Sequence, residues 1–306
     1  MAGFRQEKTT FMRKFPYVLM DVFTSKPLEG NQLAVFTDAR GLTDPQMQRI
    51  AKEMNLSETT FIVPSDPATE KERGTRVRIF TVDEELPFAG HPTLGTAVVL
   101  RGDSGKAVVE LDLNVGKIPV TFEERGAGAP AFGEMRQRDP EFGQTFDPAQ
   151  LERDLGLKPE SLHRDAVPQT VSTGMAFAII PVRSLSVLQQ LRVTWSGIEN
   201  AIQGTDAKFL YFVCKETTTP EAQVHARMIF YNGEDPATGS AAGCAAAWLV
   251  KNGWAKPDER VMIEQGVEIK RPSQIYVRAD REGEKIFNVR VGGSAVQVAA
   301  GEFQMP

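Results

Sequence analysis

The stretch GEDPATGSAAGCAAAWLVKNG, residues 233–253, places an acidic pair and a proline directly ahead of a run of small side chains. The run ends in the basic-then-glycine pattern that helix C-termini prefer. A helix of alanine and glycine is thin enough for the side chains of a curled sheet to close around it. We therefore expect a buried helix that begins near Gly239, with the carboxylates of Glu234 and Asp235 at its entrance.

The same succession of segments occurs earlier in the chain. The segment VRIFTVDEELPFAG (77–90) matches ARMIFYNGEDPATG (226–239) at a shift of 149 residues (226 minus 77), which places Gly90 on Gly239. A second buried helix is expected after Gly90, because TLGTAVVLR, residues 93–101, has no polar face. The shared order indicates two copies of one unit. Further matching ranges of strand-like composition are 29–36 with 173–180 and 58–63 with 207–212.

The duplicated unit belongs to the α/β (α+β) class, and the two copies predict two similar domains, in each of which a curled sheet encloses a buried helix. A chain of 306 residues exceeds the size at which one core usually stops growing, which favours two domains. The stretch 126–143 is rich in glycine, proline and charge and is interpreted as the linker. We place the N-terminal domain at 1–130, completed by a last strand at 293–306, and the C-terminal domain at 131–292.

Charge and composition exclude several classes of partner. The net charge is −5 and Lys and Arg are scattered, so neither nucleic acid nor a membrane surface is expected as a partner. The polar N-terminus, residues 1–15, lacks an apolar signal core, and no window of the sequence approaches a membrane span, so we expect a cytoplasmic protein. The two cysteines, Cys214 and Cys244, support neither a disulfide framework nor a zinc site.

Each copy leads from an acidic-proline turn into a helix N-terminus, at Gly90 and at Gly239. The first turn of a helix exposes unpaired N–H groups and a partial positive charge, which suits a carboxylate or phosphate. Glycine at this position lets a ligand approach the backbone closely. Two such helix starts facing each other across the cleft between the domains predict a site for an anionic small molecule.

Five motifs carry a resemblance to a known family. They are GNQLAVF (30–36), NLSETTFIV (55–63), RIFTVDEELPFAGHPTLG (78–95), EDPATGSAAG (234–243) and EQGVEIKRPS (264–273). In this order they resemble the PhzF family, the phenazine-biosynthesis-type isomerases, which share the diaminopimelate epimerase fold. The resemblance implies two similar domains, each a mixed sheet curled around a central buried helix, with the active site between them. The resemblance covers nearly the whole chain and implies a homodimer. It also implies cofactor-free isomerisation of dihydro-3-hydroxyanthranilate, in which a glutamate moves a proton between ring carbons.

The resemblance implies roles for four residues. The proton-transferring glutamate corresponds to Glu58 in SETTF, and the supporting histidine corresponds to His91 in GHP. The aspartate and the serine of the family motif correspond to Asp235 and Ser240 in DPATGS. At the 149-residue shift Glu58 falls on Ala207, so this carboxylate is present in one copy, as expected of a task performed once per chain. Without the resemblance, a lone glutamate such as Glu58 at the start of a strand is usually a surface charge, and the other three can be turn or capping residues.

Three further residues are candidates for substrate binding. Gly90 and Gly239 offer backbone N–H groups at the two helix starts. Asn31, beside Gly30, either reaches the ligand or forms an Asx turn, and the turn is favoured. The EQGVEIKRPS stretch is interpreted as a strand hairpin that completes the second sheet, in preference to a phosphate site.

Two rival functions remain open. A two-base racemase or epimerase of this fold uses a thiol from each domain at the helix entrances, but here the entrances read FAGHP and ATGSA, without cysteine. A catalytically silent binding or partner protein keeps the cleft without chemistry, and the joint presence of Glu58, His91 and Asp235 weighs against it. The favoured function is therefore proton transfer next to the carboxylate of a small-molecule substrate, with no metal and no organic cofactor.

Overall fold

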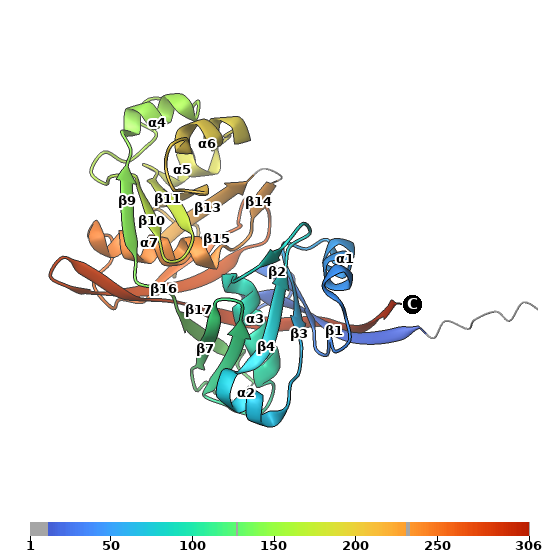
Figure 1. Cartoon of the computed structure of the whole chain (residues 1–306). Helices are drawn as coiled ribbons and strands as arrows, with labels where there is room; N and C mark the ends of the chain where they lie inside the picture. Colours follow the sequence, from blue (N-terminus) through green and yellow to red (C-terminus); the bar gives the residue numbers. More distant parts are fainter. Residues whose placement is uncertain (1–11, 127, 231–232, 306) are drawn as a thin grey trace, which may run out of the picture.

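The computed structural model describes residues 12–126, 128–230 and 233–305, so most of the polar N-terminal segment lies outside the described residues. Figure 1 shows two lobes, and in each of them strands surround one helix. This helix is α3 (Gly90–Arg101) in the N-terminal lobe and α7 (Gly239–Lys251) in the C-terminal lobe. Both helices begin at the glycines that the sequence comparison places in equivalent positions, as predicted.

The N-terminal lobe contains eight strands and three helices among the described residues. Apart from α3, its elements are β1 (Arg13–Val22), β2 (Asn31–Phe36), α1 (Asp44–Met54), β3 (Thr59–Ile62), α2 (Pro67–Arg73), β4 (Thr75–Phe80), β5 (Glu85–Leu86), β6 (Val108–Leu113), β7 (Gly116–Phe122) and β8 (Phe132–Arg136).

The C-terminal lobe follows, and its last strand continues into the N-terminal lobe. Apart from α7, its elements are β9 (Glu141–Thr145), α4 (Pro148–Asp154), β10 (Gln169–Ser172), β11 (Ala176–Pro181), α5 (Leu185–Gln189), α6 (Trp195–Ile202), β12 (Phe209–Cys214), β13 (Val224–Phe230), β14 (Gly233–Asp235), β15 (Val261–Gln265), β16 (Ser273–Glu282) and β17 (Lys285–Met305).

Strand pairing repeats in the two lobes with the same order and the same sense. In the N-terminal lobe β2–β3 is parallel, β3–β4 and β4–β5 are antiparallel, and β4–β6 is parallel. In the C-terminal lobe β11–β12 is parallel, β12–β13 and β13–β14 are antiparallel, and β13–β15 is parallel. A shared succession of this length confirms the internal duplication.

The strand register corrects one detail of the sequence comparison. The two arginines that correspond at a shift of 149 pair with Phe61 in one lobe and with Phe212 in the other. The strands β3 and β12 therefore correspond at a shift of 151 (212 minus 61). The counterpart of Glu58 is Phe209, not Ala207, because the connection between β12 and β13 is two residues shorter than the connection between β3 and β4. The second copy still lacks the carboxylate.

The predicted linker at 126–143 is shorter than expected, because β8 and β9 occupy much of it. The strand β8 pairs with β7, and the chain crosses between the lobes at residues 137–140. A Cβ atom at Gly133 in β8 would lie 2.8 Å from Leu94 Cδ1 of α3, so this glycine permits close packing and does not mark a flexible segment. The domain boundaries stay a prediction, and we propose that the N-terminal domain extends to Arg136.

The last strand joins the two lobes. Its first part pairs with β16, residues 290–294 pair with β8, and residues 295–305 pair with β1 of the N-terminal lobe. The strand therefore returns to the first lobe, as the sequence predicts. Figure 1 shows β17 crossing the molecule from beneath the C-terminal lobe into the N-terminal lobe, with the C-terminus beside β1.

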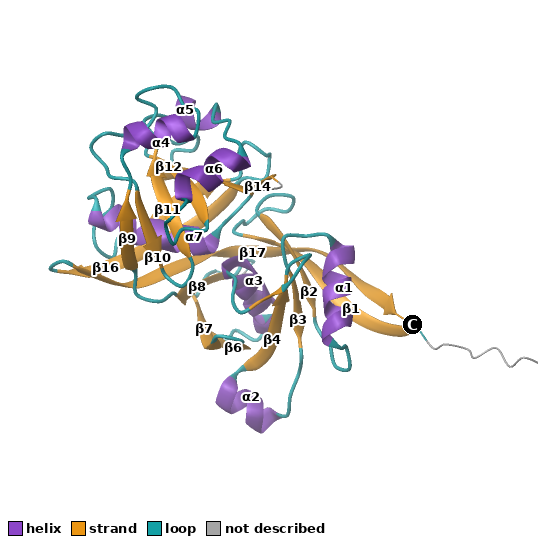
Figure 2. Cartoon of the chain, turned by 45° about the horizontal axis from the view of Figure 1, so that its top comes forward, coloured by secondary structure: helices purple, strands orange, loops and turns teal. Residues whose placement is uncertain are grey.

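The cores explain the unusual composition of α7. All residues from Ala241 to Val250 are buried, so the helix is enclosed on every side, as predicted. Helices α1 and α4 to α6 lie on the outer faces of the sheets, whereas α2 lies beyond the end of β4 (Figure 2). There α1 packs over a cluster with Phe36 and Phe61, and α4 to α6 pack over β11 and β12. Among the described residues, no helix combines the length and the apolar character that crossing a bilayer requires.

Candidate active site

The entrances of α3 and α7 meet at two glycines. A Cβ atom at Gly90 would lie 3.3 Å from the carbonyl carbon of Gly239 and 3.4 Å from the backbone nitrogen of Ser240. A Cβ atom at Gly239 would lie 3.1 Å from the ring of Phe23. The two backbones therefore approach to a distance that favours glycine, and two helix N-termini with their partial positive charges converge.

Among the described residues, no side chain caps the N-terminus of α3 or of α7. The N-cap residues are Ala89 for α3 and Thr238 for α7, and neither makes a capping hydrogen bond. Ser240 is therefore not the cap of α7, and the hydroxyl of Thr238 donates instead to Asp235 Oδ2 at 2.6 Å. First-turn N–H groups without a capping side chain are the donors that an anionic ligand requires.

Glu58 and His91 lie side by side at the N-terminal entrance. Glu58 directly precedes β3, and its Oε2 is 3.6 Å from His91 Nε2. His91 is 5% exposed, and among the described residues its Nε2 has no hydrogen-bond partner. Burial lowers the pKa of His91 to about 3, although a backbone hydrogen bond with Gln32 opposes this effect. The imidazole is therefore neutral, and its contact with Glu58 is not an ion pair.

Asn31 links the two lobes at this point. Its Nδ2 donates to Asp235 Oδ1 at 2.9 Å and to the carbonyl oxygen of Ala237 at 3.0 Å, and it lies 3.4 Å from His91 Nδ1. The favoured Asx turn is therefore wrong. Gly30, with a φ of 71°, makes the turn by itself, which leaves the amide of Asn31 free to reach across the lobes.

The two carboxyl groups have raised pKa values. Burial and the negative charge of Asp235 raise the pKa of Glu58 to about 8. Burial raises the pKa of Asp235 to about 6, while hydrogen bonds from Thr238 and Asn31 limit the increase. At neutral pH the pair therefore holds one proton, mostly on Glu58, and can both accept and donate a proton.

Gln265 is a site residue that the sequence analysis misses. Its Nε2 donates to the backbone oxygen of Asp235 at 2.7 Å and to Thr238 Oγ1 at 3.0 Å, and Tyr211 donates to its Oε1 at 2.9 Å. Gln265 lies in EQGVEIKRPS, one of the five motifs that carry the family resemblance, and this was the signal in the sequence that could have pointed to it. The strands β15 and β16 on either side of this stretch pair antiparallel, so the predicted hairpin is confirmed.

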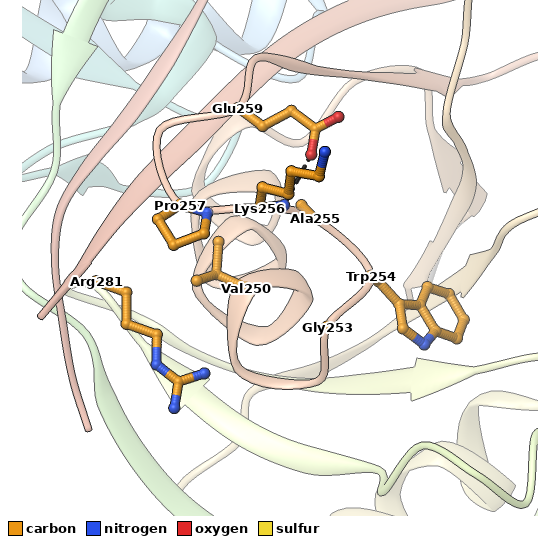
Figure 3. A pocket seen from close by; sticks show the side chains of 8 residues that line it. All are labelled: Val250, Gly253, Trp254, Ala255, Lys256, Pro257, Glu259 and Arg281. Atoms are coloured by element: carbon orange, nitrogen blue, oxygen red, sulfur yellow. Dashed lines mark hydrogen bonds between the residues drawn. The ribbon is translucent and has the colours of Figure 1, made fainter. Parts of the chain in front are cut away.

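A surface pocket of about 380 Å³ lies at the opposite end of α7 (Figure 3). It is lined by Val250, Trp254, Lys256 and Arg281 among others, and the figure shows Arg281 and Lys256 on separate segments of its rim. The pocket therefore lies at the C-terminal end of the helix, whereas the carboxyl groups described above lie at its N-terminal end.

A family model described as "phenazine biosynthesis-like protein" matches residues 20–301. The chain belongs to the PhzF family. Within the family, it is 36% identical over 294 residues to trans-2,3-dihydro-3-hydroxyanthranilate isomerase from Pseudomonas aeruginosa, a match that covers 93% of this chain and 98% of the relative. The resemblance stated from the motifs is thereby confirmed.

Two other relatives agree with the assignment to the PhzF family. An uncharacterized isomerase from Mesorhizobium japonicum is 38% identical, with coverage of 94% of this chain and 97% of the relative. The crystal structure of a PhzF-family phenazine biosynthesis protein from Bacillus anthracis has a TM-score of 0.85 at 27% identity, covering 96% of this chain and 100% of that chain. The fold class is confirmed, and we class the chain with these relatives as an isomerase.

Proposed function

We propose that this protein is a cofactor-independent isomerase that moves a proton between carbons of a small substrate bearing a carboxylate. The observation that carries the proposal is the pair of Glu58 and Asp235, whose pKa values burial raises, beside two helix entrances without side-chain caps. Strongly perturbed groups at a junction of domains are typical of catalytic sites. The curated relative from Pseudomonas aeruginosa supports trans-2,3-dihydro-3-hydroxyanthranilate as the first substrate to test.

In the proposed reaction the backbone N–H groups at Gly239 and Ser240 bind the substrate carboxylate. Ionised Glu58 takes a proton from a carbon next to a double bond, and the electron pair of the broken C–H bond shifts along the substrate. The proton held on Glu58 exchanges with solvent while the intermediate is bound, and Glu58 then delivers a proton to another carbon, which restores its charge. Asp235 and neutral His91 hold the hydroxyl or amino group of the substrate during the transfer. Atoms and charge balance without a metal or an organic cofactor.

We also propose that the protein acts in the cytoplasm as a homodimer, with no nucleic-acid or membrane partner. The net charge of −5 and the family assignment support this proposal.

Isomerisation in D₂O tests the function directly. We expect the protein to convert trans-2,3-dihydro-3-hydroxyanthranilate, with deuterium appearing at the carbon that receives the proton, because the proton taken up by Glu58 exchanges with solvent before it is delivered. Proton NMR of the reaction mixture measures both events. If neither this compound nor a panel of cyclic and acyclic amino and hydroxy acids exchanges a C–H proton, the protein is a binder and not an isomerase.

The double variant C214A/C244A is the control against a two-thiol racemase. Burial raises the pKa of both thiols to about 11, and Cys244 lies in the second turn of α7, away from its entrance. Such thiols are poor bases. Turnover by this variant is expected to stay within about threefold of wild type, because neither sulfur touches the reacting atoms. A folded but inactive double variant would establish the racemase mechanism instead.

A pH profile tests the protonation state of the carboxyl pair. Because the base form of Glu58 starts the reaction and its pKa is raised to about 8, kcat/KM is expected to rise with pH and to reach half of its maximum near pH 8. The variant D235N removes the negative charge that helps to raise this pKa, so the pKa of Glu58 should fall. Carboxyl ¹³C NMR of the free protein measures it without turnover. An unchanged titration in D235N would exclude coupling between the two groups.

A further inference from the structure

A buried ion cluster lies beside the candidate site in the C-terminal lobe. We define the His225 cluster as His225, Arg227, Glu234, Glu264 and Glu268. His225, on β13, is 0% exposed, and its two ring nitrogens contact two different carboxylates. Nδ1 lies 2.6 Å from Glu264 Oε1 and Nε2 lies 3.0 Å from Glu268 Oε1.

This geometry requires an imidazolium. A neutral ring carries one N–H and one lone pair, and the lone pair would face a carboxylate oxygen. Glu264 is ionised, because it also accepts hydrogen bonds from the backbone and hydroxyl groups of Thr218 and Thr219. Burial would lower the pKa of His225, but hydrogen bonds with Glu264 and Glu268 raise it to about 9.

The other charges around His225 disfavour its neutral form. Arg227 donates to Glu234 at 2.6 and 3.0 Å and lies 3.9 Å from Glu268 Oε2. On the other side, buried Cys214 of β12 pairs with His225 across the ladder. The cluster therefore holds two cations and three carboxylates, a net charge of −1 (2 minus 3), which becomes −2 when His225 loses its proton. Burying a second uncompensated charge is costly.

The N-terminal lobe has a permanent cation at the equivalent position. Arg76 pairs with Asp112 across β4 and β6 as His225 pairs with Glu264 across β13 and β15. Arginine keeps its charge at every pH that proteins tolerate, whereas histidine does not. The duplicated chain thus carries a titratable cation in one copy alone, the copy that supplies Asp235.

Both segments that shape the site are attached to this cluster. Glu234 directly precedes Asp235, and Glu264 directly precedes Gln265, whose amide holds the backbone oxygen of Asp235. Glu268 lies in the loop 266–272. The end of that loop contacts the N-terminal lobe, where Gly30, next to Asn31, donates its N–H to the Pro272 carbonyl at 2.9 Å.

We propose that the imidazolium of His225 is a positioning residue: it fastens the hairpin that ends in Asp235 and the loop 266–272, and thereby holds Asp235 against Asn31 of the other lobe. This inference rests on the proposed function for its effect on turnover. Loss of the charge, by substitution or at alkaline pH, loosens both segments without removing any group that touches the substrate.

The protonation state is measured first, on the unmodified protein. The chain has three histidines, so ¹⁵N-histidine NMR with the variants H163Q and H225Q assigns each ring. Both ring nitrogens of His225 should show imidazolium shifts at pH 7 and titrate near pH 9. A neutral His225 at pH 7 overturns the proposal, whatever the variants do.

Hydrogen–deuterium exchange then measures the positioning without any substrate. Relative to H163Q, H225Q should increase amide exchange in residues 233–238 and 266–272 by about tenfold or more, because local opening follows the lost ion pairs. In H225Q/E268Q the cluster regains its net charge of −1 (one cation, two carboxylates), and the two amide side chains can hydrogen-bond in place of the ion pair, so exchange should return close to the wild-type rate. Unchanged exchange in folded H225Q overturns the proposal.

The kinetic arm separates positioning from mere stability. With trans-2,3-dihydro-3-hydroxyanthranilate as the substrate, the kcat of the wild type should fall above pH 9. At pH 8 the kcat of H225Q should be about tenfold lower than that of the wild type, with little change in KM. The variant H225Q/E268Q should recover activity and should show no loss at alkaline pH. An alkaline loss that persists unchanged in the double variant contradicts the proposal. If wild type turns over no substrate while the NMR and exchange results hold, the proposed function fails and the positioning of Asp235 stands.

Discussion

The variant E58Q is expected to lower deuterium incorporation into the substrate by at least about a hundredfold, the low end of what a positioned acid-base group contributes. Glutamine has the shape of the protonated carboxyl group that predominates at neutral pH, because burial and Asp235 raise the pKa of Glu58 to about 8. The variant should therefore fold normally and bind the substrate with little change in affinity. NMR in D₂O measures exchange, and isothermal titration calorimetry measures binding.

E53Q is the matched control for this experiment. Glu53 is exposed on α1, so its substitution makes the same chemical change without touching the site. Exchange by E53Q should equal that of wild type. Full exchange by E58Q would show that another group carries the proton, and the first candidate would then be Asp235, whose pKa burial raises to about 6.

The variant R271M is expected to lower the free energy of unfolding by about 3 kcal/mol, because removing one partner of a buried ion pair leaves the other uncompensated. Arg271 Nη2 lies 2.6 Å from Asp21 Oδ1, and the same guanidinium donates to the carbonyl oxygens of Glu29 and Gly30. Asp21 is 2% exposed and would keep only the backbone N–H of Leu28 among its described hydrogen bonds. Urea unfolding followed by tryptophan fluorescence measures the change.

K14M makes the same change of charge at the surface. Lys14 pairs with Glu302 at 2.7 Å, but both side chains are more than half exposed, so about 0–1 kcal/mol is expected. The double variant D21N/R271M should regain part of the loss, since no buried charge then remains. Equal stability of R271M and K14M would show that the contact between the lobes contributes no more than a surface pair.

The sequence predicted those features that depend on neighbours along the chain. Composition and segment order predicted the two buried helices, the repeat and the meeting of Gly90 with Gly239. A helix that is apolar on all sides is stable only inside a core, and the N–H groups of a helix N-terminus need hydrogen-bond acceptors. Glycine was also a source of error. In β8 Gly133 makes room for a neighbouring side chain, and composition alone cannot distinguish this role from that of a linker glycine.

Contacts between distant segments were not predictable in the same way. Asn31 reaches Asp235 over 204 positions of sequence, and Gln265 reaches the same residue from a strand on its other side. Such contacts depend on strand register and on the packing of one lobe against the other. The equivalence of Phe209 and Glu58 in the two lobes likewise depends on a connection that differs by two residues between the copies. An ungapped sequence comparison cannot detect such a difference.

The course of β17 has a consequence for how this protein is made. Residues 295–305 pair with β1, so β1 must wait until these eleven residues have been synthesised before one of its edges is covered. Until then β1 is paired on one edge only, with β2, and its exposed edge can pair with the strands of other chains. The N-terminal lobe therefore completes its sheet only after residues 295–305 have been synthesised, and nascent chains that lack these residues should depend on chaperones.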